Sequence, residues 1–232
     1  MTEAQILKRI YPSIVTFGGD WRKMLKEVSD LKLTEISLFL TCANKTERQE
    51  IYKALKKTKV KKIPHIHARH DMTQDEFDYL VKTYNTKAFT VHYQYYLKYL
   101  KGFKHQDKFF IENNGYGADI KNLSVLKQVG GVCIDLSHLE HHRRHIYQHK
   151  KKYETAVKAA STYKVGCNHL SAVLPNGLSH HKVKNFSELE YVKNIPKHFF
   201  SPYINLELGN SIKQQLIFKK KLAKLLVKSW NK

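Results

Sequence analysis

The sequence predicts an α/β protein: a single (β/α)8 TIM barrel over residues 1–232, compact and with short loops. Strand-like and helix-like segments alternate from one end of the chain to the other. Several strand-like segments are continuous apolar runs, which are typical of parallel strands covered on both faces. No low-complexity or Pro/Gly-rich linker divides the chain, so one domain is expected. Eight such repeats favour a barrel.

Eight short apolar segments are the predicted strands. In chain order they are residues 13–17, 35–41, 61–66, 87–92, 108–113, 131–135, 164–169 and 202–207. An open, doubly wound sheet is the alternative arrangement. That fold commonly carries a G-x-G-x-x-G turn after its first strand, whereas only Gly18, Gly19 and Asp20 follow the first strand here. The barrel is therefore the better prediction.

Helices are predicted between the strands, and three of them have a capping-box start. In this pattern a Ser, Thr or Asn precedes a Glu by three residues, just before apolar residues. The three pairs are Asn44 with Glu47, Thr73 with Glu76 and Ser187 with Glu190. A last helix from Ile212 onward has an apolar face and a lysine-rich face. It is expected to pack as the final outer helix, with contact to a membrane or nucleic acid as the alternative.

The composition is that of a globular protein of a reducing compartment. Apolar residues make up 42% of the 232 residues, and no stretch approaches the roughly 18 uncharged residues that a membrane helix needs. The first residues lack the apolar segment of a secretory signal. Cys42, Cys133 and Cys167 are odd in number, and two of them lie inside predicted strands. We therefore expect small buried thiols without disulfides, and a cytoplasmic location.

The charge of the chain is strongly positive, with a formal net charge of +21. Such a surface attracts polyanions, and nucleic acid such as DNA is one candidate partner. The lysines are spread along the whole chain, however, and no nucleic-acid-binding motif accompanies them. A general lysine bias is the alternative explanation, and charge alone does not decide between the two. The oligomeric state is likewise not predicted.

Four polar residues stand at the carboxyl ends of four successive predicted strands: Glu112, Asp135, His169 and Glu207. A single residue of this kind could be a helix cap. Burying four is costly unless they share a charged partner, and in a barrel the carboxyl ends of the strands meet at the active-site face. Three carboxylates and one imidazole suit a divalent metal such as Mn, Mg or Zn, and the absence of thiolates argues against a structural zinc site.

Further histidines occupy similar positions. His65 and His67 end the third strand, His92 ends the fourth, and His138 follows Asp135 by three residues. His180 and His181 lie in the loop after the seventh strand. Imidazole can ligate a metal or relay a proton near neutral pH. Four more histidines are expected instead to belong to a solvated, cationic loop and helix: His141, His142, His145 and His149.

Four short motifs resemble the xylose isomerase-like TIM barrel superfamily. They are Ile-Glu-Asn-Asn-Gly-Tyr-Gly (111–117), Gly-Val-Cys-Ile-Asp-Leu-Ser-His (131–138), Cys-Asn-His-Leu (167–170) and Asn-Leu-Glu (205–207). This superfamily contains sugar-phosphate isomerases and epimerases, and also endonuclease IV, the AP endonuclease family 2. In element order the resemblance covers nearly the whole chain, although only these short motifs are specific.

The epimerase branch implies a role for each residue of the quartet. Its metal is held by Glu, Asp, His and Glu, which match Glu112, Asp135, His169 and Glu207. The two glutamates of that branch also act as an acid/base pair on a small sugar or sugar phosphate. The resemblance further implies that His138 contacts the substrate and takes part in catalysis. We add His67 and Asn113 as expected substrate-binding residues.

The endonuclease IV branch implies a different chemistry, the cleavage of DNA at abasic sites by a trinuclear zinc site. His65, His92 and His180 resemble its additional ligands, although the Asp-x-His pair of that branch is absent because Leu178 and Ser179 precede His180. A third hypothesis is a non-catalytic binding barrel. The metal quartet favours an enzyme, and an isomerase or epimerase is the first expectation.

Overall fold

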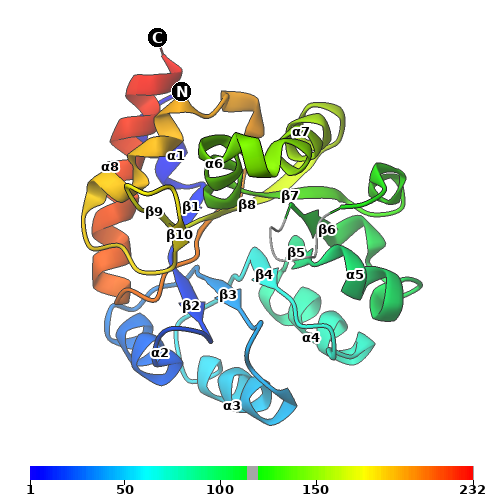
Figure 1. The fold of residues 1–232 in the computed structure, drawn as a ribbon. Coiled ribbons are helices and arrows are strands. Elements are labelled where there is room, and N and C mark those ends of the chain that lie inside the picture. Colours follow the sequence, from blue (N-terminus) through cyan, green and yellow to red (C-terminus); the bar gives the residue numbers. More distant parts are fainter. Residues whose placement is uncertain (114–119, 232) are drawn as a thin grey trace.

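Parallel strands form a closed barrel in the computed structural model, which describes residues 1–113 and 120–231 (Figure 1). The neighbouring strands of its main sheet run in the order β1-β11-β8-β7-β6-β5-β4-β3-β2, and every pair in it is parallel. Their bounds are β1 Ile10–Tyr11, β2 Ser13–Val15, β3 Ser37–Phe39, β4 His65–His67, β5 Ala88–Val91, β6 Phe109–Glu112, β7 Gly131–Asp135, β8 Val165–Leu170 and β11 Ile204–Leu206. The predicted barrel is confirmed.

The barrel closes through one extended segment that Pro12 interrupts. On one side of the proline, β1 pairs with β11, and on the other side β2 pairs with β3. Proline has no backbone N–H to donate to a sheet, so the strand divides at this residue. The first barrel strand therefore runs over residues 10–15, and the predicted range 13–17 was too late, because Ile10 and Tyr11 already pair with the last strand.

Helices surround the barrel (Figure 1). The α-helices are α1 Glu3–Leu7, α2 Trp21–Asp30, α3 Lys45–Leu55, α4 Gln74–Tyr84, α5 Tyr93–Tyr95, α6 Leu136–Arg144, α7 Ile146–Thr162 and α8 Ile212–Trp230. Tighter or wider helical segments are η1 Tyr96–Leu100, η2 Gln106–Lys108, η3 Leu123–Lys127, η4 Phe186–Asn194 and η5 Lys197–Phe199. Two predicted capping boxes are confirmed: Asn44 with Glu47 starts α3, and Thr73 with Glu76 starts α4.

The third capping box was wrong. The helical segment η4 is a 3-10 helix, and Asn185 caps it by accepting a hydrogen bond from the backbone N–H of Ser187. Ser187 is therefore already inside the segment. Asn is as good a cap as Ser, and two candidate caps so close together leave the start of the helix ambiguous in the sequence.

The last helix, α8, packs on the barrel as predicted. Its buried side chains include Ile212, Leu222 and Leu226, and it contacts α1, α2 and the first barrel strand. The two ends of the chain lie close together (Figure 1), and the Met1 amino group donates a hydrogen bond to Asn231 Oδ1 at 3.1 Å. Within residues 1–113 and 120–231, no helix has the length and apolar character needed to span a membrane.

Side chains alternate between the inside and the outside of the barrel. Since successive residues of a strand point to opposite faces, Cys133 shares the inner face with Asp135, and Cys167 shares it with His169. The two cysteines are fully buried and pack together with Ala88 inside the barrel. They are free thiols, whereas Cys42 is exposed. Apolar side chains, including the ring of Phe110, thus fill the barrel below a polar layer at the carboxyl ends of the strands.

The connection after β8 carries a small hairpin above the barrel mouth. Its strands β9, Ala172–Val173, and β10, Ser179–His180, pair antiparallel. Figure 1 shows this hairpin beside α6. Part of the 111–117 motif, from Asn114 to Gly117, lies outside the residues that the structure describes.

Candidate metal centre

The four quartet residues converge at the carboxyl ends of β6, β7, β8 and β11. Glu112 and Asp135 are the last residues of β6 and β7, His169 is the next-to-last residue of β8, and Glu207 follows β11 directly. Each is at most 6% exposed. Parallel strands in register bring these positions to one layer, with Asp135 paired directly with His169.

His169 lies at the middle of the quartet. Its Nδ1 is 2.7 Å from Glu112 Oε1 and 3.8 Å from Glu207 Oε2. The ring is fully buried and lies edge-on to the ring of Phe39, at 4.9 Å between centroids. One nitrogen of a buried imidazole therefore faces carboxylates from two different strands.

Asp135 combines a structural role with a second carboxylate oxygen that faces the site. Its Oδ1 accepts hydrogen bonds from the backbone N–H groups of Ser137 and His138 and from the Ser137 hydroxyl, at 2.6 to 2.9 Å, and so caps α6. Its backbone N–H donates to Asn113 Oδ1, and its carbonyl accepts from Asn113 Nδ2. With Oδ1 engaged and the main chain fixed, Oδ2 remains directed to the site, 3.6 Å from His138 Nε2.

Two overlapping groups of these residues could hold a metal ion: His67 with Glu112 and His169, and Asp135 with His169 and Glu207. In each group one ligand atom per residue lies within 4.8 Å of the others. Among the described residues, the ion pairs of Asp135 and Glu207 involve only histidines. Three buried carboxylates that converge in this way fit a divalent cation.

The acidity of Glu207 supports the same conclusion. Its pKa is raised well above the ordinary value by burial and by the charges of Asp135 and Glu112. A cation at the centre of the three carboxylates would remove this penalty, because it compensates both the lost hydration and the like-charge repulsion. The donor set therefore fits a metal, whose identity the residues leave open among Mn, Mg and Zn.

Two more histidines contact Glu112. Its Oε2 lies 3.3 Å from His67 Nε2 and 3.0 Å from His92 Nε2. Burial raises the pKa of Glu112, but the facing His169 and His67 outweigh this effect and hold the pKa well below its usual range. Burial lowers the pKa of His67 to about 4, so its ring is neutral at neutral pH and can act as a ligand. His67, which is expected from the sequence to bind substrate, is thus also a candidate metal ligand.

His65 lies deeper in the barrel than the quartet. Its Nε2 is 2.8 Å from Thr90 Oγ1 and 3.3 Å from His169 Nε2, and its side chain is fully buried. Thr90 Oγ1 is also 3.0 Å from His169 Nε2. A hydrogen bond from this nitrogen to Thr90 would leave His169 Nδ1 unprotonated toward the carboxylates, which is how an outer partner orients a metal ligand. His65 and Thr90 thus lie beside Nε2 of His169, and the carboxylates lie beside its other nitrogen, Nδ1.

The predicted loop histidine, His180, does not join the site. It is exposed, and its Nδ1 contacts the backbone of Lys182. Its neighbour His181 approaches instead, with Nδ1 at 4.0 Å from Glu207 Oε2 and its ring 4.5 Å from that of Phe17. Because the residues alternate across the hairpin strand, only one of the two can face the barrel, and the sequence alone does not tell which.

The histidines of α6 and α7 form a stacked cluster, and the expected solvated state is wrong for one of them. His142 is 2% exposed, with its ring 5.1 Å from that of His149. Burial, followed by the charges of His138 and other neighbours, lowers the pKa of His142 to about 3. It is therefore neutral where a cationic residue was expected, since the α6–α7 contact removes it from water.

Replacing His142 with leucine should flatten the pH dependence of stability. The unfolded histidine takes up a proton below about pH 6.5, whereas the folded one does so only near pH 3, so the wild type loses stability as pH falls between these values. From about pH 7.5 to 5.5 we expect the wild type to lose roughly 1 kcal/mol more than the variant, measured by urea unfolding. The control is a replacement of His198, which is exposed. Parallel profiles of stability against pH for wild type and His142→Leu would contradict the expectation.

The chain matches no protein-family model, and no curated protein is significantly similar to it.

Proposed function

We propose that the protein is a divalent-metal-dependent isomerase or epimerase of a small sugar or sugar phosphate. The observation that carries this proposal is the approach of two buried glutamates, Glu112 and Glu207, to the same nitrogen of His169. They come from separate strands and stand beside the third carboxylate, Asp135. Two carboxylates around one metal position provide a proton acceptor and a proton donor on different sides of a bound substrate.

The metal would polarise a carbonyl oxygen of the substrate and so acidify the neighbouring C–H bond. Glu112, whose oxygens face His67, His92 and His169, is held in the ionised form that can accept the proton. Without the metal, burial and the acidic neighbours raise the pKa of Glu207, so Glu207 takes up a proton more readily than Glu112 and is assigned as the proton donor. Opposite shifts of two neighbouring carboxyl groups are the usual basis for such a division of roles.

His138 would position the substrate at the edge of the centre. The ring of His138 is mostly buried, and its Nε2 is 3.6 Å from Asp135 Oδ2. Asn113 uses its side chain to hold the backbone of Asp135. It therefore supports the candidate metal ligand Asp135 and has no free amide group for a substrate. Asn113 could therefore contact the substrate only after its side chain rearranges; otherwise the residues beside it would make that contact.

Proton exchange with solvent tests this function directly. We expect the manganese- or magnesium-loaded protein, incubated in D2O with a panel of aldose and ketose monophosphates, to place deuterium on a carbon beside the carbonyl of at least one of them. NMR and mass spectrometry of the recovered sugars measure this exchange. If no sugar or sugar phosphate in the panel gains deuterium above the metal-only control, the proposal is wrong.

A zinc phosphodiesterase acting at abasic sites is the second candidate. It is favoured by the two overlapping donor groups, which share His169, and by the extra histidines His67 and His92 around Glu112. In such an enzyme a metal-activated water attacks phosphorus. A non-catalytic binding barrel is a third hypothesis, and no contact in the described residues favours it.

Metal content separates these functions. We expect one divalent ion per chain, because the two donor groups share His169 and so compete for its Nδ1 or Nε2. Elemental analysis of the purified protein after dialysis measures this number. Two or more zinc ions per chain, together with salt-sensitive binding and cleavage of duplex DNA containing an abasic site, would replace the isomerase by the phosphodiesterase. Absence of any bound metal would favour the binding barrel.

A further inference from the structure

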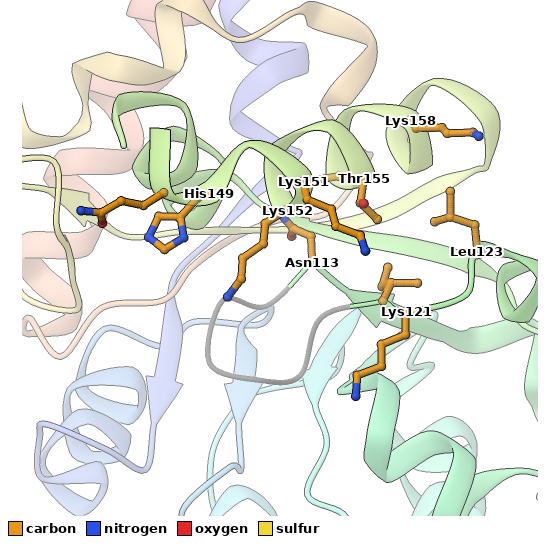
Figure 2. A pocket seen from close by; sticks show the side chains of 11 residues that line it. Asn113, Lys121, Leu123, His149, Lys151, Lys152, Thr155 and Lys158 are labelled. Carbon is orange, nitrogen blue, oxygen red and sulfur yellow. The ribbon is translucent and has the colours of Figure 1, made fainter. Parts of the chain in front are cut away.

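A basic cavity of about 630 Å³ lies beside the carboxyl end of β6, outside the metal centre. Asn113, residues around η3 and one face of α7 form its walls (Figure 2). Lysines supply its charge: Lys121, Lys151, Lys152 and Lys158. Among the described residues that line the cavity, none is an aspartate or a glutamate. The ammonium groups of Lys121, Lys151 and Lys158 around one space attract an anion.

Three of these lysines have no carboxylate partner within residues 1–113 and 120–231: Lys121, Lys151 and Lys158, all exposed. In contrast, the adjacent Lys150 points to Glu154, at 3.9 Å, and does not line the cavity. The charges of Lys151 and Lys158 on this face of α7 are therefore available to a ligand.

Two contacts join the cavity to the metal centre. Asn113 lines the cavity, directly follows Glu112, and holds the backbone of Asp135 with both atoms of its amide. On the other side, His149 lines the cavity and packs on His142, whose ring stacks 6.5 Å from that of His138. A ligand in the cavity is thus linked to the metal centre only indirectly, through Asn113 and through the ring series His149, His142 and His138.

The spacing of the lysines indicates more than one anionic group. Lys151 and Lys158 lie two turns apart on α7, about 10 Å along the helix axis at about 1.5 Å per residue. Their ammonium groups, and that of Lys121, end at separate places around the cavity (Figure 2). A single phosphate cannot lie beside all of them at once, and the cavity is within the range of roughly 300–1,000 Å³ that accommodates small organic ligands.

We propose that this cavity binds the diphosphate portion of a small organic ligand, at a site separate from the metal centre. Lys121 and Lys151 would each donate a charge-assisted hydrogen bond to phosphate oxygens, with Lys158 at the outer end. The binding of the anion by the lysines does not depend on the function proposed above.

Pyrophosphate binding to the full chain, measured by calorimetry, tests this site. We expect the double variant Lys121→Gln/Lys151→Gln to bind pyrophosphate roughly tenfold or more weakly than wild type, because two charge-assisted contacts are lost. The matched control is Lys127→Gln/Lys150→Gln, which removes the same charge from η3 and α7 outside the cavity and should stay within about twofold. Binding should occur in both the metal-free and the manganese-loaded protein, and inorganic phosphate should bind more weakly than pyrophosphate.

Several results would overturn the proposal. If pyrophosphate binding weakens equally in both double variants, the overall charge of the protein binds the anion. If it weakens in neither, the anion does not bind in the cavity. Binding that requires manganese would place the anion on the metal. Equal affinities for inorganic phosphate and pyrophosphate would mean that the site does not select a diphosphate. A single-stranded oligonucleotide that binds more tightly and depends on the same lysines would make nucleic acid the ligand. Lysine-dependent pyrophosphate binding without deuterium exchange in any substrate would retain the anion site and reject the isomerase.

Discussion

Replacing His169 with glutamine is expected to remove divalent-metal binding almost entirely. His169 belongs to both groups of residues that could hold an ion, and its Nδ1 faces Glu112 and Glu207 at once. Loss of a partner that only orients a ligand costs about 10- to 100-fold in metal affinity, and loss of the shared ligand should cost more. Titration calorimetry with Mn²⁺ and Zn²⁺ measures the change.

Two other histidine variants make this result specific. His180→Gln changes an exposed histidine of the hairpin near the same barrel mouth and should leave the affinity unchanged. His67→Gln removes one donor group only, so strong retention of metal would place the ion among Asp135, His169 and Glu207. Thermal unfolding of the metal-free proteins shows whether His169→Gln is folded. A folded His169→Gln protein that binds metal like the wild type would contradict the site.

The barrel and the quartet were predictable because each depends on local sequence. Continuous apolar strands between helices indicate parallel strands that are covered on both faces, and the closed order of strands confirms the barrel. A polar residue at the carboxyl end of such a strand is expected to face the mouth of the barrel. The structure brings the four such residues together: Glu112, Asp135, His169 and Glu207. Asp135 also shows that a cap and a candidate ligand need not be alternatives, because one carboxylate oxygen caps α6 while the other faces the site.

The remaining site residues depended on details that the sequence does not carry. His65 and His67 are two residues apart and share one face of β4, so only their depth in the barrel distinguishes them. That depth follows from the register of β4 with β5, which pairs His67 with Thr90 and His65 with Ala88. His67 consequently reaches Glu112, while His65 stays in the layer below. The choice between His181 and His180 likewise depended on the pairing of the hairpin.

The buried state of His142 shows a further limit of sequence reasoning. Nothing in a run of histidines and arginines indicates which ring will face a neighbouring helix. The structure places His142 against His149 of α7 and His138 of α6, so the cationic segment contains a neutral member. The same packing links the lysine cavity to the metal centre. It depends on the geometry of the turn between α6 and α7, which the sequence does not indicate.

Glu112→Gln and Glu207→Gln should each lower the turnover of a substrate identified by deuterium exchange by about 10²- to 10⁴-fold, the usual contribution of a positioned acid or base. The amide keeps the size of the side chain and one oxygen donor, so metal should be retained in part. A two-base mechanism makes a sharper prediction: each variant should still exchange the carbon-bound proton of the one stereoisomer whose base remains, although neither interconverts the two.

The control for these variants is Glu140→Gln, which alters another buried carboxylate. Glu140 accepts hydrogen bonds from Arg143 and Arg144 on α6 and contacts none of the quartet side chains among the described residues. Its turnover, measured well below its unfolding temperature, should stay within about threefold of wild type, because it exchanges no proton with substrate. Unchanged turnover in both Glu112→Gln and Glu207→Gln would reject the acid/base pair. Complete loss of exchange for both stereoisomers, with metal also lost, would leave the two glutamates as ligands alone.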